Sequence, residues 1–277
     1  LYNTAMGYEA GQFATTAASS TFIGFQAAKG ITGAKLTGNA NTVIGDNAGL
    51  VLQGAANENT IVGRGAAIGL TTGANNVAIG GASMGGENAA NAITGSNNVC
   101  VGYLAGYTME GASNANTLIG TSAGQNVTTG IHNVMIGTNT GDAVTTNGSN
   151  TLIGYNAGSS VTAALNTMIG YQAGTDTTAT VEGTRNIMIG YNVRGAAAGT
   201  DDQILIGNNF AGTGGNDFAF GKASNVVKCD FDTDADWARN SDERKKQNIE
   251  DDTLGLEFIN DLRTVTYKWK PAEEHPE

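Results

Sequence analysis

The feature that most constrains this chain is a short phrase that recurs along most of its length. The phrase reads Asn, a small β-forming residue, an apolar residue, Ile or Val, and then Gly, as in NTLIG at 150–154. Its closing glycines run from Gly7 to Gly207 in eleven steps with a mean of about 18 residues, and single steps vary from 16 to 22. Such a period predicts a stack of repeated units whose insertions are confined to loops.

Each phrase predicts one short strand, because Asn and Gly bound a run of β-branched and apolar residues. Twelve copies occur, at 3–7, 20–24, 41–45, 59–63, 76–80, 98–102, 116–120, 133–137, 150–154, 166–170, 186–190 and 203–207, and a degenerate thirteenth, DFAFG, occupies 217–221. One such unit cannot bury its apolar face, whereas stacked units can. The sequence therefore predicts an all-β fold, a parallel β-roll or β-solenoid of about 12 repeats over residues 1–221, with about 4.8 Å between coils.

The composition excludes several classes of protein. The 277 residues include 41 Gly but only 2 Pro, so the chain is not a collagen. No apolar run approaches the roughly 18–20 residues of a membrane-spanning helix, so no membrane insertion is expected. The two cysteines, Cys100 and Cys229, form neither a disulfide framework nor a paired zinc-ligand spacing, and we expect no metal and no cofactor.

Charge is distributed unevenly along the chain. Residues 1–200 hold 5 Lys and Arg against 8 Asp and Glu, whereas residues 201–277 hold 9 against 17. An acidic chain without a basic stripe is a poor nucleic-acid binder, and we expect no nucleic-acid partner. The change after Gly221 predicts an acidic linker at 222–240 and a short α+β segment at 241–277. Asp232, Asp234 and Asp236 alternate, which fits either a cation site or, as we favour, an acidic strand edge or turn.

The two faces of each strand predict an oligomer. Alternate residues of a strand point to opposite sides, so Thr151 and Ile153 share one face and Leu152 points the other way. The third position of the phrase is apolar in all twelve copies, although a lone solenoid should expose one polar face. We therefore predict a homotrimer about a common axis. We expect the fourth position and the Thr column to face the coil interior and the third position to face the axis.

Other recurring residues suggest binding surfaces or internal support. The Asn column, with Asn116, Asn133, Asn150 and Asn166, fits ligand or ion binding, but side-chain amides that satisfy turn backbone are the favoured interpretation. Receptor contacts are expected on the longest loops, Phe25–Ala40, Gly81–Asn97 and Tyr171–Arg185. Tyr103, Tyr107, Tyr155, Tyr171 and Tyr191 are candidate sugar-stacking rings or a packing column.

The phrase NTxIGxxAG resembles the repeats of phage tail fibres and the head repeats of trimeric autotransporter adhesins. In the adhesins similar phrases form a trimeric left-handed parallel β-roll, and the resemblance covers about residues 1–221. It implies a homotrimeric, extracellular virion fibre that contacts other tail proteins and a host surface receptor, either a glycan or a surface protein. A bacterial trimeric surface adhesin is the alternative within this class.

The C-terminal residues resemble the start of the intramolecular chaperone domain that ends many phage tail spikes and fibres, including endosialidases. The matching positions are Ser241, Asp242, Arg244, Lys246, Val265, Tyr267 and Trp269. The resemblance implies assistance in trimer assembly by a domain of which 241–277 is a truncated beginning, so we expect this sequence to be part of a longer chain.

The same resemblance implies self-cleavage, as many members of that family cut the chain just before the Ser. Ser241 would be the nucleophile, Lys246 its general base and Asn240–Ser241 the scissile bond. A Ser hydroxyl needs such a base, and a Lys serves only when it is neutral. The same residues also fit a helix N-terminus followed by a solvated basic turn, and both interpretations stand.

A polysaccharide-degrading tailspike is the enzymatic alternative. Glycosidases use paired carboxylates in a groove, whereas the eight acidic residues of 1–200 are scattered and never form a repeated pair. The sequence thus predicts a structural and receptor-binding protein rather than an enzyme that turns over substrate.

Overall fold

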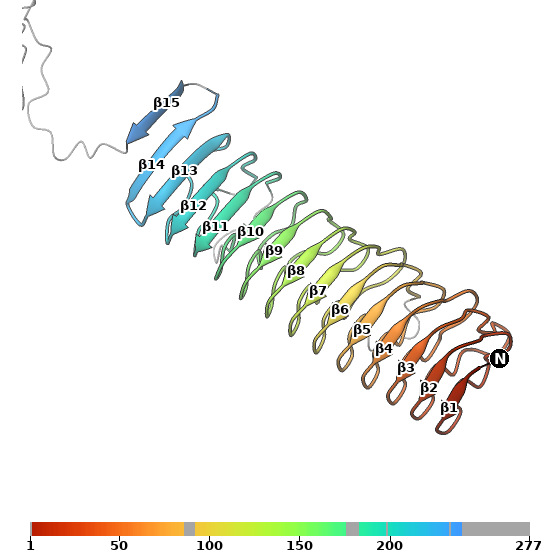
Figure 1. The fold of residues 1–277 in the computed structure, drawn as a ribbon. Helices are drawn as coiled ribbons and strands as arrows, with labels where there is room; N and C mark the ends of the chain where they lie inside the picture. The colour runs from red at the N-terminus through yellow and green to blue at the C-terminus, as the bar shows by residue number, and fades with distance from the viewer. Residues whose placement is uncertain (1, 86–91, 176–182, 198, 233, 240–277) are drawn as a thin grey trace, which may run out of the picture. The chain divides into compact units, whose positions relative to one another are not determined.

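The computed structural model describes residues 2–85, 92–175, 183–197 and 199–232, and also the backbone of 234–239. The chain divides into two compact units, 1–240 and 241–277, and the described residues all lie in the first. Its described strands form one sheet of 15 strands in chain order, and they lie side by side in a single row (Figure 1). The predicted all-β solenoid of about twelve parallel turns is confirmed.

The strands are short, and twelve of them coincide with the repeated phrases. They are β1 (Thr4–Met6), β2 (Thr21–Ile23), β3 (Thr42–Ile44), β4 (Thr60–Val62), β5 (Val77–Ile79), β6 (Val99–Val101), β7 (Thr117–Ile119), β8 (Val134–Ile136), β9 (Thr151–Ile153), β10 (Thr167–Ile169), β11 (Ile187–Tyr191), β12 (Ile204–Asn208), β13 (Asp217–Lys222), β14 (Asn225–Asp230) and β15 (Asp234–Arg239).

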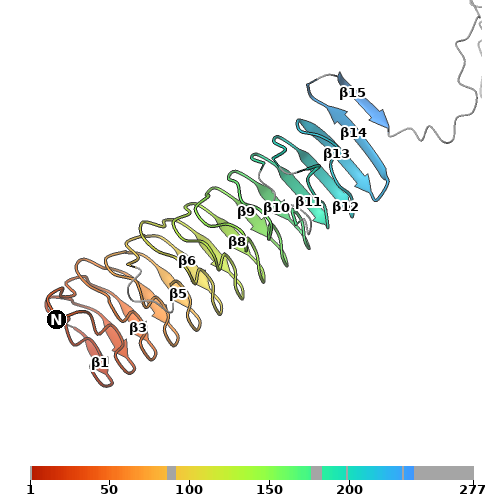
Figure 2. The same ribbon diagram turned by 180° about the vertical axis from the view of Figure 1, so that it is seen from behind.

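The register repeats without slippage along the parallel part of the sheet. Each phrase pairs position by position with the next, as in Thr151 with Thr167 and Ile153 with Ile169. Turns and loops complete each coil behind the strand row (Figure 2). The parallel order continues to β13, after which β13, β14 and β15 pair antiparallel. Residues 222–240, predicted from sequence to be an acidic linker, therefore contain β14 and β15.

The glycine that closes each phrase allows neighbouring coils to approach closely. Gly137 has φ +134°, and a Cβ added there would lie 2.4 Å from the backbone oxygen of Gly154 in the next coil. The same contact recurs from Gly7 to Gly207. No L-residue combines this backbone angle with this spacing, which explains why the fifth position of the twelve phrases is always Gly.

The third position of each phrase, rather than the fourth, fills the interior of the coil. Leu152 is fully buried, whereas Thr151 and Ile153 on either side of it are half-buried on the outside of the sheet. The expectation that the fourth position and the Thr column face inward is therefore wrong. The physical reason lies in the AG pair that follows the strand: a Cβ added to Gly158 would lie 2.7 Å from Cδ2 of Leu152, so this glycine makes room for the third-position side chain.

The buried Asn column satisfies backbone groups inside the stack. Asn150 donates from Nδ2 to the carbonyl oxygen of Ala163 at 3.1 Å, and its Oδ1 accepts the backbone N–H of Asn166 at 3.0 Å. The fully buried members are Asn41, Asn59, Asn76, Asn98, Asn116, Asn133, Asn150, Asn166 and Asn186. Because these amides bond the turns of their own and adjacent coils, the interpretation of the column as internal support is confirmed.

Candidate interaction surface

The outside of the sheet forms a continuous surface that we name the outer strip. It consists of positions 2, 4 and 6 of each phrase from β1 to β12, where position 1 is the Asn or its equivalent. Position 6 shares this side because β11 continues through Gly190 to Tyr191, so that Ile187, Ile189 and Tyr191 alternate onto one face. The strip therefore has two inner columns of Thr, Val and Ile and one outer column.

The outer strip is almost free of charge. Its second and fourth positions from β1 to β12 are Thr, Val, Ile or Met throughout. In the sixth column Asp46 and Arg64 are the two charged residues, and both are exposed. Ile79 at the end of β5 and Ile206 in the middle of β12 remain 38% and 40% exposed. A long, partly apolar strip with so few charges is typical of a protein–protein contact surface.

The aromatic residues of the sixth column stack on one another. The rings of Tyr155 and Tyr171 have centroids 5.3 Å apart, and those of Tyr171 and Tyr191 are 5.2 Å apart. Tyr8 and Phe25 make a similar stack at 5.4 Å. Because Tyr171 has a ring stacked on each side, it has no free ring face for a sugar.

The two remaining candidate rings lie outside this stack. Tyr103 occupies the sixth column and is 59% exposed. Tyr107 lies four residues further along the coil and is half-buried.

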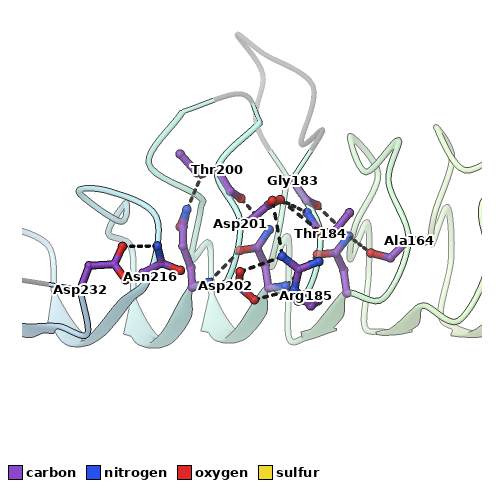
Figure 3. A network of polar contacts seen from close by, with 12 residues as sticks. Ala164, Gly183, Thr184, Arg185, Thr200, Asp201, Asp202, Asn216 and Asp232 are labelled. Carbon is purple, nitrogen blue, oxygen red and sulfur yellow. Dashed lines mark hydrogen bonds and ion pairs between the residues drawn. The ribbon is translucent and has the colours of Figure 1, made fainter.

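Polar contacts bind the last coils to one another near the start of the strands (Figure 3). The guanidinium of Arg185 donates to both carboxylate oxygens of Asp202, at 2.7 Å and 2.8 Å. Asp201 accepts the backbone N–H of Thr184 at 2.6 Å. The Arg185 guanidinium holds the pKa of the Asp202 carboxyl below its usual value, and Asp202 in turn raises the pKa of Arg185. These contacts hold the coils of β11 and β12 together.

A similar polar contact joins the first two coils. Lys29 Nζ lies 2.6 Å from a carboxylate oxygen of Glu9, and Gln26 donates to the same oxygen at 2.8 Å. Both donors lower the pKa of Glu9.

The interior of the coils holds a buried cysteine, Cys100. Cys100 lies in the third-position column with its Sγ 3.6 Å from Sδ of Met109. Burial raises the pKa of the Cys100 thiol to about 12, so it stays protonated near neutral pH. Cys100 and Cys229 are both buried.

Several predicted site residues fall outside the described part of the chain. They are Asn240, Ser241 and Lys246, together with residues 86–91 and 176–182 of two candidate receptor loops. The side chains of Asp234 and Asp236 also lie outside it, so the alternating aspartates stay untested. The described residues contain no group of three or more His, Cys, Asp or Glu arranged to hold a metal. They also contain no helix long and apolar enough to cross a membrane.

The comparison with known families finds a match in the C-terminal residues. Residues 241–277 match the family model described as the chaperone of endosialidase, which supports the resemblance noted for this segment. No curated protein and no solved structure matches the chain. The sequence analysis assigned the second and fourth positions to the coil interior and so did not predict the outer strip. The glycine of the AG pair, which makes room for the third-position side chain, was the signal that could have indicated it.

Proposed function

We propose that this chain is the structural and receptor-contacting part of a phage tail fibre, assembled as a homotrimer and exposed on the virion. One combination of features carries the proposal: a solenoid of twelve coils, whose outer strip has few charged residues, is followed by a match to the chaperone of endosialidase. A uniform shaft needs an additional element to align its subunits, and a chaperone segment after the last coils supplies one.

The outer strip is the surface proposed for the trimer contact. Position 4 presents a column of Ile and Val that is half-buried within one subunit, and a neighbouring subunit would remove the rest from water. Host attachment is assigned to the loops on the remaining sides of the coils, because loops carry sequence variation without disturbing the stack.

Native mass spectrometry of the full chain tests the assembly. The expected species is a trimer, either of the 28.2 kDa chain or of the product that ends at Asn240 once the self-cleavage proposed below has occurred. The double variant Ile136→Lys, Ile153→Lys should dissociate to monomers, because it places charge in the fourth column. The matched control Thr129→Lys, Thr146→Lys carries the same added charge away from the strip and should stay trimeric. A monomeric wild-type chain would overturn the proposed assembly.

The C-terminal segment is proposed to assist that assembly, with self-cleavage as its associated chemistry. Hydrolysis of Asn240–Ser241 would consume one water and release a new carboxylate on Asn240 and a new amine on Ser241. The expected result is a product ending at Asn240 in the wild-type chain and its absence in Ser241→Ala. Intact trimers of both the wild-type chain and the Ser241→Ala variant would contradict the self-cleavage but not the fibre assembly.

Binding to host cells tests the attachment role. Fluorescently labelled trimer should bind intact cells of the host that is lysed by the parent phage and should not bind cells resistant to that phage. Equal binding to both cell types would contradict specific attachment.

A further inference from the structure

In three coils the residues at the two ends of the outer strip are complementary. The sixth column forms one edge. The other edge is the residue immediately before position 1, which we name position 0 and which is Glu58 in the coil of β4. Position 0 adopts left-handed backbone angles, as in Glu58 at φ +56° and Leu165 at φ +65°, and most of its members are exposed.

One coil carries opposite charges at its two edges. From β1 to β12, the coil of β4 alone has a charged residue at both edge positions, Glu58 at position 0 and Arg64 at position 6. Both side chains are exposed, and among the described residues neither has a salt bridge or a side-chain hydrogen bond. Six residues, three of them in β4, separate these positions by up to about 20 Å, and the two side chains form no salt bridge within one subunit.

Apolar residues show the same correspondence in two other coils. In the coil of β10, Leu165 at position 0 is 53% exposed and Tyr171 occupies position 6. In the first coil the two edge residues are Tyr2 and Tyr8, which are 90% and 64% exposed. Exposed Leu and Tyr at matching edges suit contact with a second copy better than contact with water.

We propose that position 6 of each coil contacts position 0 of the same coil in the neighbouring subunit, and that the Glu58–Arg64 pair sets this register. The inference rests on the homotrimer of the proposed function and specifies how its subunits meet. Around a three-fold axis with parallel chains, the carboxyl-end edge of one strip meets the amino-end edge of the next at equal height. The Glu58–Arg64 contact then forms three times in the assembly.

The dimensions of the strip suit three copies. A triangle with sides of about 20 Å places each sheet about 6 Å from the axis, close to half of the ~10 Å that separates packed sheets. Four copies would leave about 10 Å from sheet to axis, too far for Ile side chains to fill. Twelve coils at about 4.8 Å, over a width of up to about 20 Å from position 0 to position 6, give a face of up to roughly 1,100 Å² per subunit, and a stable interface needs about 800 Å² per partner.

Disulfide trapping in the coil of β9 tests the register. Ser149 is position 0 and Tyr155 is position 6 of this coil. The double variant Ser149→Cys, Tyr155→Cys should give a covalent trimer on mild oxidation, because the two cysteines are too far apart to bridge within one subunit. The matched control Ser149→Cys, Tyr191→Cys displaces one cysteine by two coils, or about 10 Å, and should not cross-link.

Charge reversal tests the specific pair. Glu58→Arg and Arg64→Glu should each raise the concentration at which the trimer dissociates by about tenfold, and the double reversal should restore it. Glu110→Arg makes the same change of charge at a position away from the strip, and it should change the dissociation concentration of the trimer little.

The outcomes separate the register from the assembly. A native trimer in which the same-coil cysteines fail to cross-link, or in which the double reversal does not restore stability, would overturn the inference and leave the trimer intact. A covalent dimer would also overturn it, because two copies facing each other would replace three. A monomeric wild-type chain would overturn the proposed assembly itself.

Discussion

The glycine that closes each phrase is the residue on which the approach of successive coils most depends. Replacing Gly137 by Ala should destabilise the fold by at least about 2 kcal/mol, because the new Cβ would lie 2.4 Å from the oxygen of Gly154 and the backbone has φ +134°. Denaturant unfolding followed by circular dichroism, at one fixed subunit concentration, measures the change.

Gly81→Ala is the matched control for that prediction. Gly81 follows the closing glycine of its phrase, and the nearest atom to an added Cβ is Cδ2 of Tyr103 at 3.5 Å, an ordinary contact. This variant should stay within about 0.5 kcal/mol of the wild type. Equal losses in both variants would mean that glycine composition, and not the close approach at position 5, limits stability.

The Asn column predicts a second residue-scale effect. Asn150→Ala should cost about 2–4 kcal/mol, because it leaves the carbonyl oxygen of Ala163 and the N–H of Asn166 without their buried partner. Asn126→Ala is the control, since the Asn126 side chain makes its hydrogen bonds to Asp142 in an exposed position. Thermal unfolding of the two variants should separate them clearly, and a silent Asn150→Ala would contradict the structural role of the column.

At the scale of elements, the contact between the coils of β11 and β12 predicts a dependence on pH. Arg185 lowers the pKa of Asp202 in the folded chain, so the folded state binds fewer protons than the unfolded state as the carboxyl titrates. The stabilisation is therefore present above the unfolded pKa and is lost as the pH falls through the folded pKa. Asp202→Asn should lower the unfolding temperature slightly near pH 7, and the difference should shrink as the pH falls below about 4 and vanish once the pH lies below the lowered folded pKa of Asp202.

Asp46→Asn is the control for this dependence, since Asp46 has no salt bridge within the part of the chain that the structure describes. It should change the unfolding temperature little at either pH. A difference between Asp202→Asn and the wild type that persists at low pH would assign the effect to packing instead of charge.

The repeated phrase predicted the strands, their parallel order and the glycine-dependent stacking, because each is a local consequence of which residues recur. The orientation of the strand could not be obtained the same way. Leu152 and Ile153 are both apolar, and alternation states only that they point apart. Which of the two is buried depends on the residues on the opposite side of the coil. On that side Gly158, which has no side chain, leaves room for Leu152. The stack of Tyr155, Tyr171 and Tyr191 depends on the same orientation. The sequence shows that a Tyr follows the closing glycine in these coils, but not that the three rings stack on one another.

At the scale of the whole molecule, the stack behaves as a series of interchangeable coils joined to their neighbours. Most of the described hydrogen bonds that leave a coil join it to the coil directly before or after it. The same strand register repeats from β1 to β13. The stability of such a fold is approximately a sum over coils and over contacts between neighbours. The antiparallel strands β14 and β15 break this regularity after the last parallel pair.

Removing one complete coil should therefore leave a folded and shorter molecule. Deletion of 133–149 joins His132 to Asn150, so the residue before the Asn again occupies position 0, and β7 pairs directly with β9. Leu118 then meets Leu152 in the interior and Asn116 meets Asn150 in the buried column, both of which are contacts between residue types already present. Small-angle scattering should show a trimer shortened by about 4.8 Å, with retained β-structure. Deletion of 133–140 removes less chain but breaks the register, and it should unfold the coils around it. If the shorter deletion were the better tolerated of the two, the coils would not be interchangeable and the additive description of the stack would fail.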